Sequence, residues 1–133
     1  MVAYLELADY LLIAEAILGV SAFDLARIAR IELADAALKA PEASFGVKEL
    51  YPDFETKAAV LCWHLVRSHP PPDGNKRAAF LSLVELVRHN GYEWRRGQRD
   101  PAETDAVIRA AAAGECGVDE LRDWIVSRIS RAD

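Results

Sequence analysis

Residues 69–77, His-Pro-Pro-Pro-Asp-Gly-Asn-Lys-Arg, gather the side chains that phosphate chemistry needs into one short stretch. A histidine side chain ordinarily has a pKa near neutral pH, so His69 can accept a proton from an attacking hydroxyl. Asp73 is the one carboxylate of the stretch, and Mg²⁺ bound together with nucleotide phosphates takes only one or two protein carboxylates. A base, a metal ligand and two cations in this order favour the transfer of a phosphate-containing group.

The second half of the stretch predicts an anion site at the start of a helix. Asp73-Gly74 is a turn pair and residues 78–84 form an apolar run, so residues 74–77 should be the first helical turn. Free N–H groups and the helix dipole attract an anion there. Lys76 and Arg77 add cationic donors, although positive charge at a helix start opposes the dipole. A bound anion would neutralise this unfavourable positive charge.

Each of these features also has an ordinary structural interpretation. A histidine near a helix end, an Asp-Gly turn and a solvated Lys-Arg pair are all common without any function. The functional interpretation depends on their order within nine residues.

This stretch resembles the signature of the Fic/Doc family, roughly His-Pro-Phe-x-Asp/Glu-Gly-Asn-Gly/Lys-Arg, and Lys76 resembles the Doc branch. Residues 49–52 (Glu-Leu-Tyr-Pro), 57–59 (Lys-Ala-Ala) and 90–92 (Asn-Gly-Tyr) are similar to family landmarks in the same order. The resemblance extends over about residues 20–115.

The resemblance implies an all-α fold, a Fic/Doc-type helical bundle around a central helix, with ATP and Mg²⁺ as cofactors. His69 would be the base and Asp73 the metal ligand. A phosphate cradle would come from Gly74, Asn75, Lys76 and Arg77, and the implied catalytic set is His69, Asp73, Asn75, Lys76 and Arg77. We expect a Doc-like toxin that transfers the terminal phosphate of ATP to a Ser or Thr of a target protein, such as a translation elongation factor. A Fic-type adenylyltransferase is the alternative, which Lys76 disfavours.

One residue departs from the family pattern, because Pro71 stands where the family has Phe. In the family that ring packs under the loop, and truncating a buried Phe commonly costs about 3–5 kcal/mol. The stiff run of three prolines can restrict the loop in another way. We therefore expect reduced activity. A further alternative is a pseudoenzyme that acts as a nucleotide- or partner-binding module.

Residues 43–51 have neither a helix cap nor a helical stripe and predict a short β-hairpin. In the resembling proteins the matching segment is a flap that covers the nucleotide and pairs with the target polypeptide. The flap residues would be Phe45, Gly46, Val47, Lys48 and Glu49. An ordinary connecting loop is the alternative.

A separate antitoxin is the expected partner. Inhibitory Fic helices end in Glu-Gly or Glu-Asn, and no Glu of this chain precedes Gly or Asn. By resemblance, a disordered antitoxin segment would fold onto apolar positions of the first two helices.

Composition limits the remaining possibilities. At 133 residues and 52% hydrophobic content, we expect a single domain over residues 1–133. The net charge of −5 disfavours direct nucleic-acid binding. Cys62 and Cys116 are too few for a disulfide framework, which favours a reducing cytoplasm. Acidic residues interrupt the apolar N-terminal run, so we expect no membrane span.

Helical periodicity is present along most of the chain. We expect helices over about residues 4–18 and 22–38, from a cap at Asp53 towards His69, over 75–89, from 101 to a stop at Gly114, and over 118–129, bundled around residues 75–89. Tyr92-Glu93-Trp94 is a second extended candidate, more typical of packing than of a site.

Overall fold

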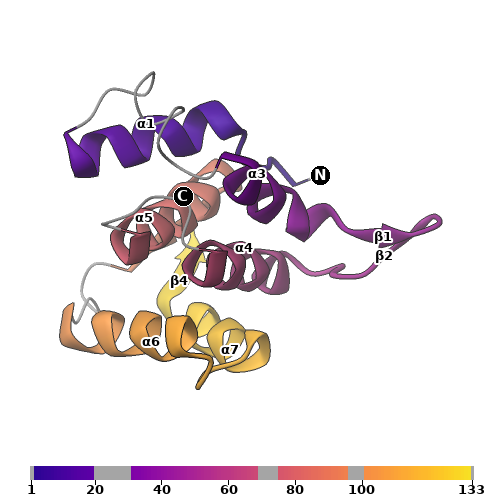
Figure 1. The fold of residues 1–133 in the computed structure, drawn as a ribbon. Coiled ribbons are helices and arrows are strands. Elements are labelled where there is room, and N and C mark those ends of the chain that lie inside the picture. The colour runs from indigo at the N-terminus through magenta and orange to yellow at the C-terminus, as the bar shows by residue number, and fades with distance from the viewer. Residues whose placement is uncertain (1, 20–30, 69–74, 96–100, 133) are drawn as a thin grey trace.

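The computed structural model describes residues 2–19, 31–68, 75–95 and 101–132, and most of these residues are helical (Figure 1). The helices are α1 (Leu7–Leu18), α3 (Ile31–Lys39), α4 (Phe54–Ser68), α5 (Asn75–His89), α6 (Pro101–Ala113) and α7 (Val118–Arg128), with a 3₁₀ turn η1 (Ala40–Glu42) after α3. The all-α fold class is confirmed. The predicted N-terminal part of the second helix, residues 22–30, lies outside the described residues.

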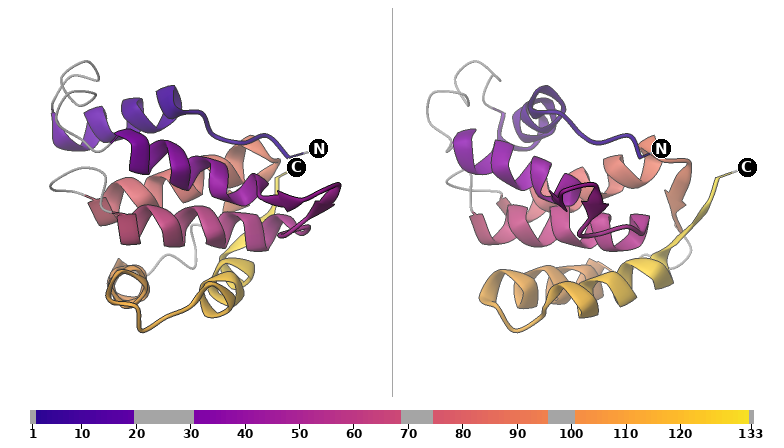
Figure 2. Two further views of the ribbon diagram at one scale, coloured as in Figure 1. Left: turned by 45° about the vertical axis from the view of Figure 1, so that its right-hand side comes forward. Right: turned by 90° about the vertical axis from the view of Figure 1, so that its right-hand side faces the viewer.

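The helices form three layers. The α4 and α5 helices lie in the middle, α1 and α3 cover one side, and α6 and α7 cover the other (Figures 1 and 2). We expected the bundle to centre on α5. The α4 helix shares that position, because it packs against α3, α5, α6 and α7.

The core is built around α4. Apolar side chains surround most of this helix, as expected of a helix with neighbours on several sides. Its buried residues are Lys57, Ala58, Ala59, Val60, Leu61, Cys62, Leu65 and Val66. Cys62 and Cys116 are both buried free thiols, and burial raises the pKa of the Cys62 thiol to about 12. A thiol of this kind behaves as a small apolar side chain.

Two helix starts depend on caps. Asp53 Oδ2 accepts hydrogen bonds from the Thr56 amide at 3.0 Å and from the Thr56 hydroxyl at 2.7 Å, which confirms the predicted cap of α4. The α1 helix begins at Leu7 rather than near Tyr4, because Glu6 has extended backbone angles (φ −99°, ψ 164°) and its N–H donates to Asp9 Oδ2 at 2.8 Å. Hydrophobic periodicity alone placed the start of α1 too early, because the cap at Glu6 determines where the helix begins.

Two small antiparallel sheets accompany the described helices. The strands β1 (Ser44–Phe45) and β2 (Lys48–Glu49) form the predicted hairpin. The extended segment β3 (Tyr92–Trp94) pairs with β4 (Ile129–Arg131), and Trp94 lies opposite Ile129. The last helix therefore ends at Arg128, one residue before the predicted end. Ile129 is buried in the strand, and its spacing of four residues from Ile125 also fits a continuing helix, so periodicity did not distinguish the two conformations.

No helix among the described residues is both long enough and apolar enough to cross a membrane.

Candidate functional site

The first turn of α5 presents two cations to solvent. The helix begins at Asn75, Lys76 and Arg77 are exposed, and Ala78 and Ala79 behind them are buried. Among the described residues, no carboxylate lies within ion-pair distance of Lys76 or Arg77. The turn thus combines backbone donors with two side-chain cations that no described acid neutralises, which is an arrangement suited to a phosphate group.

The rest of the predicted motif falls outside the described residues. This applies to His69, Pro71, Asp73 and Gly74. Their roles as base, metal ligand and cradle stay predictions, as does the role of the Asn75 side chain. The structure does show the two helices that flank the motif. The α4 helix ends at Ser68, α5 begins at Asn75, and the two helices pack against each other.

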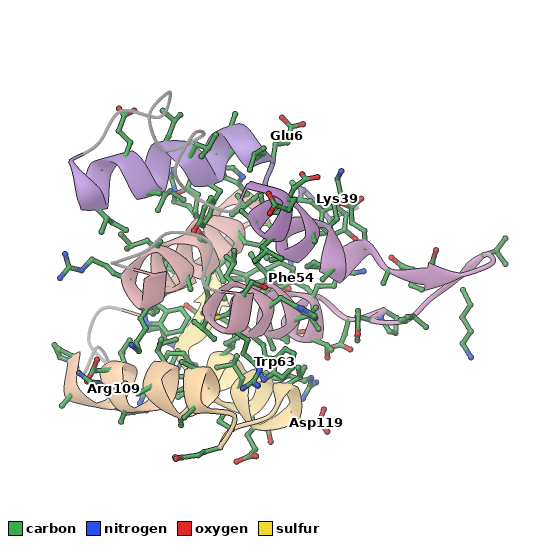
Figure 3. The ribbon with its side chains drawn as sticks, in the orientation of Figure 1. Glu6, Lys39, Phe54, Trp63, Arg109 and Asp119 are labelled. Carbon is green, nitrogen blue, oxygen red and sulfur yellow. The ribbon has the colours of Figure 1, made fainter. Side chains whose placement is uncertain are left out.

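The last turns of α4 are fixed to the layer below. Trp63 points from α4 towards α6 and α7 (Figure 3), and its Nε1 donates to the carbonyl of Cys116 at 3.3 Å. The Arg67 guanidinium stacks over the Trp63 ring at 5.0 Å and donates to the carbonyl of Ala111 at 3.4 Å. The end of α4, which leads to His69, is therefore held by α6 and by the loop between α6 and α7.

His64 lies one turn before the end of α4 and was not a predicted site residue. Its side chain is half-buried, and this burial lowers its pKa. Burial therefore favours the neutral form of this ring.

The start of α5 is fixed by buried contacts of its own. Ser82 Oγ, which is fully buried, donates to the carbonyl of Ala78 at 2.7 Å. Phe80 meets Trp94 edge to face at a centroid distance of 5.3 Å, and Trp94 meets Trp124 in the same way at 5.1 Å. A rigid helix start keeps its backbone donors in a constant direction, which a site for a charged ligand requires.

The described residues contain no group of three His, Cys, Asp or Glu side chains that could hold a metal ion. The predicted ligand Asp73 lies outside them. A single carboxylate together with phosphate oxygens is a donor set that suits Mg²⁺, and the exposed cations of α5 suit the phosphates. The residue types present therefore fit a magnesium nucleotide, and the role of Asp73 as protein ligand of the metal stays a prediction.

The predicted flap residues lie at the other end of α4 (Figure 2). The hairpin precedes Phe54, whereas the motif follows Ser68, and a helix of 15 residues separates these ends by roughly 20 Å. Gly46 turns the chain with φ +65°, and Val47, Lys48 and Glu49 are exposed. The structure confirms the hairpin but does not bring it to the start of α5. Its role as a cover over the nucleotide stays a prediction.

Lys57 belongs to a family landmark in the sequence, and the structure shows it as a buried cation at the hairpin end of α4, which we did not predict. Its side chain is only 1% exposed, and Nζ donates to the carbonyl of Pro41 at 3.1 Å and to Glu49 Oε1 at 3.0 Å. Burial lowers the pKa of Lys57, but the interactions with Tyr4 and Glu49 more than offset this and raise it above its ordinary value. The sequence carried a signal, because Lys57 stands three residues after Phe54 and four before Leu61, at a core position of the helical stripe.

Comparisons with known proteins agree with this arrangement. The sequence model of the Fic/DOC family matches residues 4–87, which extend from the segment before α1 almost to the end of α5 and include the whole motif. The protein named Toxin Doc of Mycolicibacterium smegmatis is 30% identical over 89 residues, covering 67% of this chain and 68% of that protein. On both grounds, this chain belongs to the Fic/DOC family.

Proposed function

We propose that this chain is a Doc-like toxin that transfers the terminal phosphate of ATP to a Ser or Thr hydroxyl of a target protein, with a translation elongation factor as the predicted target class. One observation carries the proposal. The motif leads into a helix whose first turn exposes Lys76 and Arg77 without a described acidic partner. Membership of the Fic/DOC family supports a transferase in general, and similarity to Toxin Doc supports a toxin.

Each residue of the motif has its own role in this reaction. His69 accepts the proton of the target hydroxyl, whose oxygen bonds to the γ-phosphorus while the bond to the β-phosphate oxygen breaks and ADP leaves. Lys76, Arg77 and the backbone donors around Gly74 and Asn75 hold the phosphates. Mg²⁺ held by Asp73 would supply positive charge to the phosphate oxygens.

A cavity on the opposite side of the molecule supports an antitoxin as partner. It has a volume of about 400 Å³ and lies between the segment before α1 and the α3 helix, the described part of the two helices on which we expected the partner. It is lined by Tyr4, Leu5, Glu6, Leu7, Asp35, Leu38, Lys39 and Glu42. Three carboxylates and one amine in this lining favour an amphipathic segment with basic residues over an acidic one.

Label transfer tests the chemistry. The purified chain is incubated with Mg²⁺, proteins of a cell extract and either γ-labelled or α-labelled ATP, with His69→Ala as the inactive comparison and Arg109→Met as a surface control. We expect γ label on protein, lost in His69→Ala and kept in Arg109→Met. Label from α-labelled ATP would establish adenylylation instead. Bound nucleotide without label from either source would indicate a binding module.

Pro71 gives a second prediction about the same reaction. Replacing it by the family residue in Pro71→Phe restores a ring that can pack under the loop, so we expect faster turnover than in the native chain. Initial rates of label transfer at saturating ATP measure this effect. If turnover stays the same, Pro71 does not weaken the site.

A further inference from the structure

Among the described residues, no other helix or strand packs broadly against the β1–β2 hairpin, and Lys57 supplies its side-chain link to the core. Its strands are two residues each, and the Leu50 amide closes its base by donating to the carbonyl of Ala43 at 3.0 Å. Val47 at the tip is fully exposed, and Leu50 is about half exposed. An isolated hairpin of this length is at best marginally stable in water, so its direction depends on what holds its base.

Lys57 holds both ends of that base. Pro41, which accepts one hydrogen bond from Nζ, lies in the η1 turn before the hairpin, and Glu49, which accepts the other, lies on the returning strand. The ammonium group also lies 5.6 Å from the centre of the Tyr4 ring, in the segment before α1. One buried cation of α4 thus joins three separate segments.

A buried charge is a costly way to stabilise a core, because an apolar side chain of the same volume commonly serves as well. A buried charged group is better explained by the arrangement of neighbouring segments that its hydrogen bonds require. Glu49 is half exposed, so the contact reaches from the core to a part of the chain with little other support.

From these contacts we infer that Lys57 is a positioning residue that sets the direction of the β1–β2 hairpin and thereby presents the hairpin to the target protein. The second half of this inference rests on the proposed transferase function. The hairpin precedes α4 and the motif follows the other end of that helix, roughly 20 Å away along its axis, so the hairpin would engage the target away from the reacting atoms. If the hairpin loses its fixed direction, binding of the target should therefore weaken while the chemical step stays the same.

The first experiment measures the hairpin directly and requires no activity. We would record ¹⁵N order parameters for the amides of Lys48, Glu49 and Leu50 in the native chain, in Lys57→Met and in Glu49→Gln. Lys57→Met keeps the length of the side chain without its charge, and Glu49→Gln alters an exposed residue that folding tolerates. The control Arg109→Met likewise replaces a cation by Met, at an exposed position of α6 that pairs with Asp105.

We expect order parameters of about 0.85 in the native chain and in Arg109→Met, and below about 0.6 in Lys57→Met and Glu49→Gln. The Leu83 and Leu86 amides of α5 should be unaffected. Unchanged hairpin order parameters in both variants would overturn the inference. A merely structural role for Lys57 would lower the melting temperature without changing these fast motions.

The second experiment reads the consequence for the target. With γ-labelled ATP and increasing amounts of cell extract, the extract concentration that half-saturates labelling should rise about threefold in Glu49→Gln, while labelling at saturation stays within about twofold. The half-saturating extract concentration should be no higher for the double variant Lys57→Met/Glu49→Gln than for Lys57→Met alone, because both changes break the same contact between Lys57 and Glu49. An equal loss at saturation would assign Lys57 to the fold only. If the native chain transfers no label, the proposed function fails, whereas the order parameters still decide whether Lys57 positions the hairpin.

Discussion

At the scale of single residues, the start of α5 carries a conflict between stability and ligand binding. Lys76 and Arg77 place positive charge where the helix dipole favours negative charge, and acidic residues are absent from the first turn. Because these two cations are unfavourable in the protein without a ligand, their presence indicates that an anion binds at the start of α5. Arg77 adds a forked donor that matches phosphate oxygens.

Reversing one of these charges should separate the two effects. We expect Lys76→Glu to stabilise the nucleotide-free chain by about 0.5 kcal/mol through the helix dipole, and to weaken ATP binding at least tenfold. Urea unfolding and ATP titration calorimetry measure the two quantities.

Lys39→Glu is the matched control for this charge reversal, because Lys39 lies in the last turn of α3. There a cation is favourable, so the same change should cost stability and leave ATP binding intact. Unchanged ATP affinity in Lys76→Glu would contradict the proposed phosphate site.

Tyr10 gives a second prediction at this scale. Its ring is 1% exposed, its hydroxyl has no hydrogen-bond partner among the described residues, and burial raises its pKa well above the ordinary range. Because an unsatisfied buried hydroxyl is costly, Tyr10→Phe should raise the free energy of unfolding by about 1 kcal/mol. Denaturant unfolding at pH 7 measures the change. A loss of stability would indicate that the hydroxyl has a partner in the native protein.

At the scale of elements, the start of α4 joins two layers of the bundle. Asp53 caps α4 and also accepts a hydrogen bond from Arg122 Nε of α7 at 3.2 Å. Burial raises the pKa of Asp53, but the hydrogen bonds from Thr56 and Arg122 more than offset this, so the pKa lies below its ordinary value of 3.8. The carboxylate form thus stabilises the folded state.

The sign of this shift predicts a pH dependence. A carboxyl group with a lowered pKa in the folded state contributes stability above its unfolded pKa and loses it as pH falls through the folded one. We expect Asp53→Ala to cost about 1 kcal/mol at pH 7, and this difference should shrink below pH 3.8. Urea unfolding at pH 7, 5, 4 and 3 measures it. Asp53→Asn, which keeps a capping oxygen, should lose less at pH 7, and an equal difference for Asp53→Ala at pH 5 and pH 3 would contradict this account.

The end of α6 depends on a glycine that also contacts α4. Gly114 has φ +79°, and a Cβ there would meet Arg67 Nη1 at 2.8 Å, whereas Gly19 has φ +70° with open space around it. Both Gly→Ala changes should therefore cost about 1 kcal/mol in backbone strain, and Gly114→Ala should cost more because Arg67 must move. Thermal unfolding of the two variants separates these effects, and equal losses would show that Arg67 adjusts freely.

How far the sequence predicts this structure depends on which kind of signal each element has. The bounds of α5 match the prediction because a turn pair and Asn90-Gly91 mark its ends. Strand β4 was missed, since Ile125 and Ile129 are four residues apart and fit a continuing helix equally well. Lys57 was missed as a contact, because its partners Pro41 and Glu49 are distant in sequence and only the fold brings them together. The position of the hairpin relative to α5 is likewise a property of the tertiary structure.

At the scale of the whole molecule, the family match ends before the last four elements. It covers residues 4–87, while β3, α6, α7 and β4 follow. These later elements are nevertheless part of the same core, because Leu121 and Ile125 are fully buried and α7 packs along α4. Glu103 of α6 accepts hydrogen bonds from Trp124 at 2.9 Å and from Arg128, both of α7. The layer beneath α4 therefore stabilises the helix that leads into the motif.

This sharing of one core predicts that the chain unfolds as a single cooperative unit. A single domain below 150 residues usually unfolds in one step, and here α4 contacts both outer layers. All three tryptophans, Trp63, Trp94 and Trp124, lie at the contacts of α4, α5, β3 and α7, whereas far-UV circular dichroism reports every helix. We expect the fluorescence and dichroism curves to coincide throughout a urea titration. Loss of dichroism before fluorescence would mean that α1 and α3 unfold separately, so that the chain would not be one cooperative domain.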